Sequence, residues 1–439
     1  MKCLLKFVSA RSPAAAKAVH ARLTGDRGSA PLSPEPGRRD PATAPETAMT
    51  LHLRSFLAAL AAGGLGLTGC ATLPQTETAA LCRAEGVSLH ADFPTAGQHR
   101  CLARSVETVI VRTDPEVAIA PRINPSPWFA FDIEREEAGP IEIVLDYGGY
   151  RHRYEPRIRR PGEDWQRVDP AHIEVLEEEN RARLTLDLPA GRTRISAQPT
   201  YTPADVAGWS AAFADAHGFT AIEYGRSLEG RPLQALVAGP ADAGRLLVAL
   251  TRQHPPEYSG GRAFEAFATV IGEAHDGGAL AGYRLVLVPL ANPDGMANGH
   301  WRLNSGGMDL NRDWFEAEQP EIAALQALIR REAEGRDVEV FLDFHSTRRT
   351  LVYNPPAGIA ARGDALMAEM AARFSAALDP QPEWIEGHNA DAGTSKAWAL
   401  QTFGVAGLTV ELADEASIEE SHTVGRLAAE AVLAIAAGH

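Results

Sequence analysis

The chain has 439 residues, more than one hydrophobic core usually serves, so we expect two folded domains. Hydrophobic residues make up 45% of it and charged residues 23%, an ordinary composition for a globular protein. The formal net charge of −15 argues against a nucleic-acid partner, because phosphate binding needs a basic surface. After position 70, no run of apolar residues is long enough to span a bilayer.

The N-terminal segment differs in composition from the rest. Residues 1–48 are rich in Ala, Pro, Arg and Ser and have no sustained helix or strand period, so we expect them not to fold. From Met49 the chain reads MTLHLRSFLAALAAGGLGLTGC, with Arg54 ahead of an apolar stretch. This layout is typical of a secretory signal peptide, predicted here for residues 49–69.

The end of this stretch, LTGC, resembles the lipobox of a bacterial lipoprotein signal. The resemblance implies that Cys70 becomes the lipidated first residue, and that Ala71 directs the protein to the outer membrane, facing the periplasm. The lipid anchor would be its one membrane contact. Residues 1–48 would then be an over-extended start, with Met49 as the initiator. The alternative is an apolar N-terminal helix that stays attached.

The chain contains four cysteines, Cys3, Cys70, Cys82 and Cys101. Only Cys82 and Cys101 would keep a free thiol in the mature, lipidated protein. An exported protein meets an oxidising compartment, so these two can form a disulfide, and two buried thiols are the alternative. We expect residues 70–85 to be a linker.

An alternating pattern of apolar and polar residues runs through residues 86–200. The apolar positions include Phe129, Phe131 and Ile133, then Ile141, Ile143, Leu145 and Tyr147, then Leu184, Leu186 and Leu188. Half-buried strands separated by Gly, Pro and Asn turns predict an all-β sandwich domain. This range carries no recognisable set of chemical residues, so the domain is expected to pack against its neighbour or to orient a substrate.

The pattern changes near residue 200. Thr202 can cap a helix that begins at Pro203, which places a domain boundary here, with the second domain at residues 201–439. Strands are predicted at 245–250, 283–290, 338–344 and 407–412, and helices near 261–275, 320–333, 363–378 and at the C-terminus. This alternation predicts an α/β domain whose sheet is largely parallel and covered by helices on both faces.

Polar residues follow the predicted strands of this domain. His254 and Glu257 come after the strand at 245–250, His345 directly follows the strand at 338–344, and Glu411 lies near the end of the strand at 407–412. Ligands of open α/β sheets bind beyond the carboxyl ends of the strands. Two histidines and a carboxylate are the ligands of a catalytic zinc that keeps a position open for water. Taken alone, His254 and Glu257 fit a surface turn better, because such pairs occur by chance.

A long loop rich in Gly and Asn, residues 292–314, contains Arg302 and Arg312. Long loops without regular structure tend to be functional. Arginine suits carboxylate recognition because its planar fork donates two parallel hydrogen bonds. The alternative is a pair of solvated surface arginines.

Seven motifs, taken in their order along the chain, resemble the zinc carboxypeptidase family, also called funnelins. They are YGRSLEGRPL, RQHPPE, NPDG, HWRLN, GMDLNRDW, DFHS and TVEL. The resemblance covers roughly residues 200–439. It implies the zinc carboxypeptidase fold, an α/β domain with a mostly parallel or mixed sheet and helices on both faces. The preceding sandwich, with PWFAFDI and PTYTPAD, is similar to the cytosolic carboxypeptidase branch of the family.

The resemblance assigns a role to each polar residue singled out above. His254, Glu257 and His345 would be the ligands of one Zn²⁺, and Glu411 would be the general base. Arg302 would lie at the scissile carbonyl group of the substrate. Asn311 and Arg312 would grip the terminal carboxylate of the substrate. The chain departs from the family at Leu400, near where a tyrosine is expected, which leaves the substrate lid and the side-chain pocket open. Arg348, Arg349 and Lys396 could line a pocket for an acidic side chain or form a charged rim.

The leading hypothesis is therefore a lipid-anchored zinc carboxypeptidase in the bacterial envelope, which removes one residue from peptides with a free C-terminal carboxylate. The first alternative is a zinc amidase or deacylase acting on a non-peptide amide, which would not need Asn311 and Arg312. The second is a non-catalytic envelope-binding lipoprotein that kept the fold. The sequence indicates neither the residue removed nor the oligomeric state.

Overall fold

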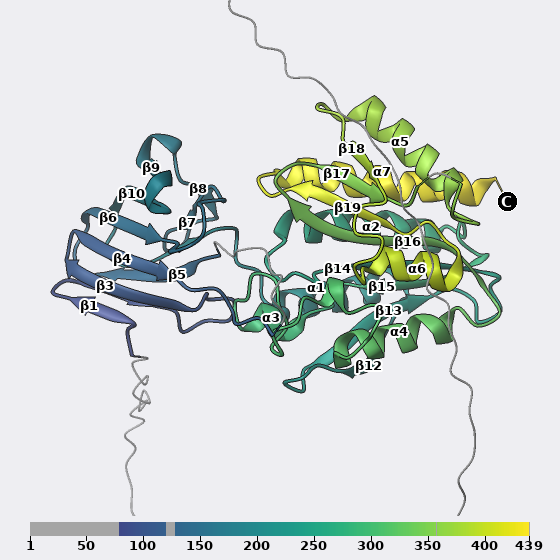
Figure 1. The fold of residues 1–439 in the computed structure, drawn as a ribbon, viewed down its shortest axis with the longest axis horizontal. Coiled ribbons are helices and arrows are strands. Elements are labelled where there is room, and N and C mark those ends of the chain that lie inside the picture. The colour runs from purple at the N-terminus through teal and green to yellow at the C-terminus, as the bar shows by residue number, and fades with distance from the viewer. Residues whose placement is uncertain (1–78, 120–127, 357, 439) are drawn as a thin grey trace, which may run out of the picture. The chain divides into compact units, whose positions relative to one another are not determined.

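A computed structural model describes residues 79–119, 128–356 and 358–438 (Figure 1). The segment 1–48, the signal at 49–69 and Cys70 lie outside the described residues, so these predictions stay predictions. Among the helices of the described ranges, none is long and apolar enough to cross a membrane. All described elements belong to the unit Pro74–His439.

The first half of the described chain is a sandwich of two sheets, as predicted. One sheet has the order β1-β2-β5-β11-β7-β8 and the other β3-β4-β6-β10-β9. The strands are β1 (Cys82–Ala84), β2 (Val87–His90), β3 (His99–Ser105), β4 (Thr108–Thr113), β5 (Ala130–Arg135), β6 (Gly139–Asp146), β7 (Arg157–Arg159), β8 (Gln166–Arg167), β9 (Ile173–Leu176), β10 (Arg181–Leu188) and β11 (Gly191–Ser196). Short 3₁₀ turns, η1 (Pro170–His172) and η2 (Glu177–Glu179), flank β9. The alternating residues of the sequence pattern fill the core between the sheets, as Phe131 and Ile143 do.

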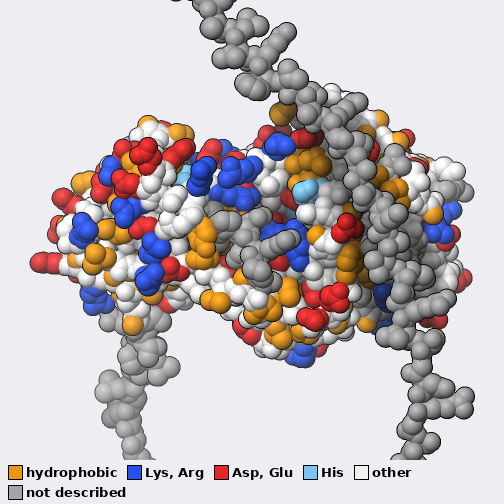
Figure 2. Space-filling model, viewed as in Figure 1, with side chains coloured by type: hydrophobic (Ala, Val, Ile, Leu, Met, Phe, Trp, Pro, Cys, Tyr) orange, Lys and Arg blue, Asp and Glu red, His pale blue; other side chains and the backbone are white. Residues whose placement is uncertain are grey.

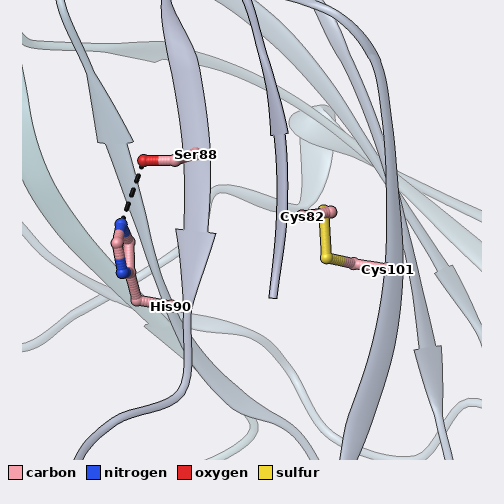
Figure 3. The surroundings of a disulfide bond; sticks show 4 residues. All are labelled: Cys82, Ser88, His90 and Cys101. Carbon is pink, nitrogen blue, oxygen red and sulfur yellow. Dashed lines mark hydrogen bonds between the residues drawn. A yellow bond between two sulfur atoms is a disulfide. The ribbon is translucent and has the colours of Figure 1, made fainter. Parts of the chain in front are cut away.

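A disulfide between Cys82 and Cys101 joins β1 of one sheet to β3 of the other (Figure 3). The alternative of two buried thiols is therefore wrong. The expected linker at 70–85 is also corrected, because β1 lies inside it. A strand of three residues is too short for its alternation to be read. Pairing with β2 and the disulfide hold it at the sheet edge instead of a run of apolar side chains.

The second half contains an eight-stranded mixed sheet in the order β12-β13-β15-β14-β16-β19-β17-β18. Its strands are β12 (Thr220–Arg226), β13 (Pro232–Ala238), β14 (Arg245–Thr251), β15 (Tyr283–Val288), β16 (Asp337–Thr347), β17 (Leu351–Asn354), β18 (Glu383–Glu386) and β19 (Leu408–Ala413). The central strands β15, β14, β16 and β19 are parallel to one another. The sheet is mixed rather than largely parallel because β12, β13 and β17 pair antiparallel.

Helices cover both faces of this sheet, as predicted. They are α1 (Pro203–His217), α2 (Tyr258–Asp276), α3 (Pro293–Ala297), α4 (Pro320–Glu332), α5 (Asp364–Ala377), α6 (Ser395–Phe403) and α7 (Ile418–Ala437), with a 3₁₀ turn η3 (Leu310–Arg312). One core holds Phe264 of α2 and Val424 of α7, and the other holds Leu325 of α4 and Trp398 of α6. The predicted cap of α1 is present, because Thr202 and Asp205 form a reciprocal capping box.

The register of the central strands brings the predicted site residues to one edge. β14 ends at Thr251, so the loop with His254 and Glu257 leaves the sheet there. Its neighbour β16 runs through His345, which lies directly opposite Glu411 of β19. Because these three strands are parallel, their carboxyl ends meet at the same edge.

Candidate active site

His254, Glu257 and His345 form a cluster at this edge. Glu257 precedes the first residue of α2, and its two carboxylate oxygens each lie 2.7 Å from an Nδ1 atom, one of His254 and one of His345. Among the described residues, this is the one group of at least three His, Cys, Asp or Glu whose ligand atoms converge, all within 4.8 Å of one another. The arrangement is that of a candidate metal site.

Two aspartates fix the orientation of the histidines. Asp309 lies 3.0 Å from Nε2 of His254, and Asp343 lies 3.0 Å from Nε2 of His345. A carboxylate on the far nitrogen keeps that nitrogen protonated and leaves Nδ1 free as a ligand. Two imidazole nitrogens and one carboxylate oxygen suit a metal that keeps a position open for water, so the donor set fits catalytic zinc.

The charged groups around the histidines shift the pKa values of the cluster. Burial lowers the pKa of His345, but the carboxylates of Asp343 and Glu257 outweigh it and hold this pKa well above its usual value. Burial raises the pKa of Asp309, but the charges of Arg302 and His254 outweigh it and hold that pKa well below its usual range. The carboxylates around the histidines therefore favour a positive charge at this place, which a metal ion can supply.

Glu411 adds a carboxylate of a different kind. Burial raises the pKa of Glu411 to about 7, although the charge of His345 opposes this shift. Its buried Oε2 atom has no hydrogen-bond partner among the described residues. A carboxyl group with such a pKa, beside a cluster of metal-ligand residues, can take a proton from water near neutral pH.

The loop at 292–314 supplies polar groups to the same place. Nε of Arg302 donates a hydrogen bond to Asp309 at 2.6 Å, so this arginine is tied to a carboxylate that also contacts His254. The amide oxygen of Asn311 accepts a hydrogen bond from the backbone of Ser395. Arg312 donates to the carbonyl oxygen of Asn311 at 2.6 Å and has no carboxylate partner within the described ranges.

These residues line one pocket of about 620 Å³. The lining includes His254, Glu257, Arg302, Asn311, Arg312 and Glu411, together with Tyr353, His388, Lys396 and Arg153. His345 is buried beneath it and reaches the cluster through Nδ1. The structure thus brings together every predicted site residue that it describes. Cys70, the predicted lipidation site, lies outside the described residues.

Several residues of the pocket were not predicted from the sequence. Tyr353 of β17 stacks on His388, with ring centroids 4.4 Å apart, and its phenol faces the pocket where the sequence offered only Leu400. Leu400 lies on α6 and does not line the pocket. Arg153 comes from the sandwich domain, whose role in the site had no signal in the pattern of alternation.

The three cations that could have recognised an acidic side chain lie in different places. Lys396 is in the pocket, whereas Arg348 and Arg349 line an adjoining groove of about 1210 Å³. Arg151 and Arg153 line the same groove from the sandwich side. Figure 2 shows Lys and Arg side chains gathered on this face, where the sandwich meets the second domain. The pocket and the groove share Arg153, Thr347 and Tyr353, so they are continuous.

Residues 254–436 match the family model described as the succinylglutamate desuccinylase/aspartoacylase catalytic domain. An uncharacterised protein of Zymomonas mobilis is 25% identical over 233 residues, which are 50% of this chain and 58% of that protein. Cytosolic carboxypeptidase 3 of Mus musculus is 30% identical over 115 residues, 25% of this chain and 11% of that protein. The matched part is thus less than two thirds of either relative.

Two solved structures share the architecture. A metallo-carboxypeptidase from Burkholderia cenocepacia has a TM-score of 0.66 at 18% identity, covering 79% of this chain and 98% of that one. A metallo-carboxypeptidase from Pseudomonas aeruginosa, in complex with (2-guanidinoethylmercapto)succinic acid, has a TM-score of 0.63 at 22% identity, covering 79% and 99%. The predicted fold, the zinc carboxypeptidase fold preceded by a β-sandwich, is confirmed.

Proposed function

We propose that this chain, a hydrolase of the carboxypeptidase and desuccinylase superfamily, is a zinc carboxypeptidase that removes an acidic residue from the C-terminus of peptides. One observation carries the proposal. A single pocket holds a convergent metal-ligand cluster, the carboxylate of Glu411, whose buried Oε2 atom has no hydrogen-bond partner, and two cations, Arg312 and Lys396, without an acidic partner among the described residues.

The metal would be held by the Nδ1 atoms of His254 and His345 and by the carboxylate of Glu257. Bound zinc lowers the pKa of a coordinated water to about 7 and polarises a carbonyl group. Asp309 and Asp343 keep the two imidazoles in the tautomer and orientation that this ligation requires.

The two catalytic side chains act on the reacting atoms. Glu411 takes one proton from the attacking water and passes it to the leaving amine, and its raised pKa suits both transfers. Arg302 lines the pocket beside the cluster, where its guanidinium opposes the negative charge that develops on the carbonyl oxygen. Loss of such a donor typically costs about 100- to 1000-fold in rate.

Arg312 gives the pocket its preference for the C-terminus of a substrate peptide. Its fork has no carboxylate partner in the described part of the chain and can bind the terminal carboxylate of a substrate through two parallel hydrogen bonds. Asn311 lies next to it on the same pocket wall. An amidated C-terminus offers no negative charge to this pair.

Lys396 narrows the substrate preference to peptides whose C-terminal residue is acidic. Its side chain is buried, and burial together with the nearby charge of Arg312 lowers the pKa of its ammonium group to about 8. Its ammonium group donates a hydrogen bond to the backbone oxygen of His388. A second buried cation beside Arg312 is costly unless a carboxylate arrives. A terminal Glu or Asp brings two carboxylates, one for each cation.

Deacylation of a small N-acyl amino acid is the second candidate, favoured by the family model over residues 254–436. The same two cations would accept an acyl glutamate or acyl aspartate. The groove that continues from the pocket favours a peptide, because a small acyl group would not reach the residues that line it.

One comparison tests both candidates on the full chain loaded with Zn²⁺. The substrates are a pentapeptide that ends in Glu, the same peptide amidated, the same peptide ending in Leu, and N-succinylglutamate, and free amino acid is measured. We expect release mainly from the Glu-terminated acid. Equal turnover of acid and amide would overturn the carboxypeptidase, faster turnover of N-succinylglutamate would establish the deacylase, and no release at all would leave a binding protein.

The location is proposed separately, from the lipobox resemblance alone. We propose that the mature protein is anchored in the outer membrane through Cys70 and faces the periplasm. The protein with Cys70→Ser should appear in the soluble fraction, whereas the wild type should sediment with membranes. Equal partition of the two would contradict the anchor.

A further inference from the structure

Glu116, in the segment that follows β4 of the sandwich, binds the backbone of the loop that carries Arg302. Its carboxylate accepts hydrogen bonds from three successive amides, those of Trp301 at 3.2 Å, Arg302 at 2.7 Å and Leu303 at 3.0 Å. Glu116 is only 7% exposed, and no cationic side chain of the described residues pairs with it. Its negative charge is therefore balanced by backbone dipoles.

The same loop is attached to the sandwich on both sides of Arg302. Trp301 belongs to the hydrophobic core of the sandwich, and its indole donates to the hydroxyl of Tyr154 at 2.7 Å. The backbone of Ile119 donates to Gly307 at 3.0 Å. The main chain around Arg302 is thus held by the first domain as well as by contacts within the second, such as the hydrogen bond from the backbone of His300 to Gly295.

The side chain of Arg302 is fixed from the other end by Asp309, which also contacts His254. The guanidinium can face the pocket only if both its backbone and this carboxylate are in place. Glu116 and Asp309 therefore hold the two ends of one residue. A displacement of about 1 Å at such a residue can cost on the order of 100-fold in rate.

We propose that Glu116 is a positioning residue for Arg302, and that the β-sandwich is in this way part of the active site. The inference rests on the proposed function, in which Arg302 stabilises the transition state. It replaces the expectation that the sandwich only packs or orients a substrate. Glu116 does not touch the substrate and acts through the backbone of Arg302.

The first variant is Glu116→Gln in the full chain. The amide keeps the shape but one of its acceptor oxygens becomes an NH₂ group, which meets backbone donors. We expect kcat on the Glu-terminated peptide to fall about 10-fold or more, with KM and zinc content unchanged, since an oxyanion donor acts in the transition state. Glu116→Asp keeps the charge and should lose less.

A double-mutant cycle separates positioning from a general loss of structure. In the Arg302→Ala background, Glu116→Gln should cause little further loss of kcat. The matched control is Asp132→Asn, because Asp132 is another buried carboxylate of the sandwich, bonded to Arg194 within that domain. It should lower the thermal midpoint and leave kcat unchanged.

Hydrogen exchange gives a readout that does not depend on activity. In Glu116→Gln, the amides of residues 301–303 should exchange faster, while those of β16 stay protected. Wild-type kcat in a folded Glu116→Gln, the same factor of loss in the Arg302→Ala background, or unchanged exchange at 301–303 would each overturn the inference. If Arg302→Ala alone leaves kcat unchanged while exchange responds as expected, the proposed role of Arg302 fails instead.

Discussion

The Nδ1 atoms of His254 and His345 lie 3.2 Å apart, and the carboxylate of Glu257 contacts both of them. Two ring nitrogens meet at this distance without cost only if they share a proton or a cation. Their Nε2 atoms are engaged by Asp309 and Asp343. The two Nδ1 atoms and the carboxylate of Glu257 are therefore ligand atoms that converge on one point. Metal binding is for this reason the property to measure first.

Removal of the metal should destabilise the chain as well as inactivate it. A ligand that binds only the folded state stabilises it by about 4 kcal/mol when present at 1000 times its dissociation constant. Dialysis against a chelator should lower the thermal midpoint and abolish peptide hydrolysis, and one equivalent of Zn²⁺ per chain should restore both. A thermal midpoint that ignores the chelator would contradict a metal held by His254, Glu257 and His345.

The aspartates behind the histidines should set zinc affinity. Asp309→Asn and Asp343→Asn should each weaken zinc binding by about 10- to 100-fold, because each Nε2 atom loses the negatively charged acceptor that orients its imidazole. Competition with a chromophoric chelator measures this without reference to activity. The control is Asp313→Asn, since Asp313 is buried in the same loop but caps the backbone of Gln319. Equal affinities in all four proteins would refute the assignment.

Glu411 should be needed for catalysis but not for the metal. Its Oε2 atom has no partner among the described residues, and the convergent ligand set does not include it. Glu411→Gln should therefore keep one zinc per chain and lose about 100- to 10,000-fold in kcat, the range that general bases typically supply. Retained zinc with unchanged hydrolysis would assign the proton transfer to another group.

The sequence predicted the central strands of the second domain because they are buried on both faces and form continuous apolar runs. β14 and β16 are examples, and their ends located His254 and His345. β12 was missed because most of its side chains are exposed or half-buried and no apolar run marks it. The strands β17 and β18 have four residues each, too few to show a period.

The part of the site that the sequence could not predict depends on distant contacts. Asp309 lies 55 positions after His254, and Glu116 lies 186 positions before Arg302. A buried carboxylate that binds backbone amides leaves no charge pattern in the sequence. The ligands themselves were predictable because each sits at a strand end, whereas the residues that orient them depend on how loops and domains meet.

Lys396 should determine the preference for an acidic terminal residue. Lys396→Met keeps the length of the side chain and removes its charge, so KM for the Glu-terminated peptide should rise about 10-fold or more, while KM for the Leu-terminated peptide should fall or stay unchanged. Arg348→Met is the matched control, because Arg348 lies in the groove and not in the pocket. A rise in KM for both peptides alike would place Lys396 at the terminal carboxylate instead.

His99 provides a test of stability that does not involve the metal-ligand cluster. It is the first residue of β3. Its Nε2 atom accepts a hydrogen bond from the backbone of Ala130 at 3.2 Å, and its ring packs edge to face against Phe131. Burial lowers the pKa of His99 from 6.5 to about 4, with a smaller opposing effect from the charge of Asp114. The folded chain therefore holds a neutral imidazole at a pH where the unfolded chain binds a proton.

This difference should make the sandwich less stable in mild acid. Between pH 6.5 and about 4 the unfolded state binds more protons at this position, so the contribution of His99 is fully present above pH 6.5 and is lost as the pH falls towards 4. The full difference is on the order of 3 kcal/mol. His99→Gln keeps an acceptor for Ala130 but does not titrate, so its thermal midpoint should fall less than that of the wild type over this range. Parallel curves for the two proteins would show that the imidazole is not held neutral.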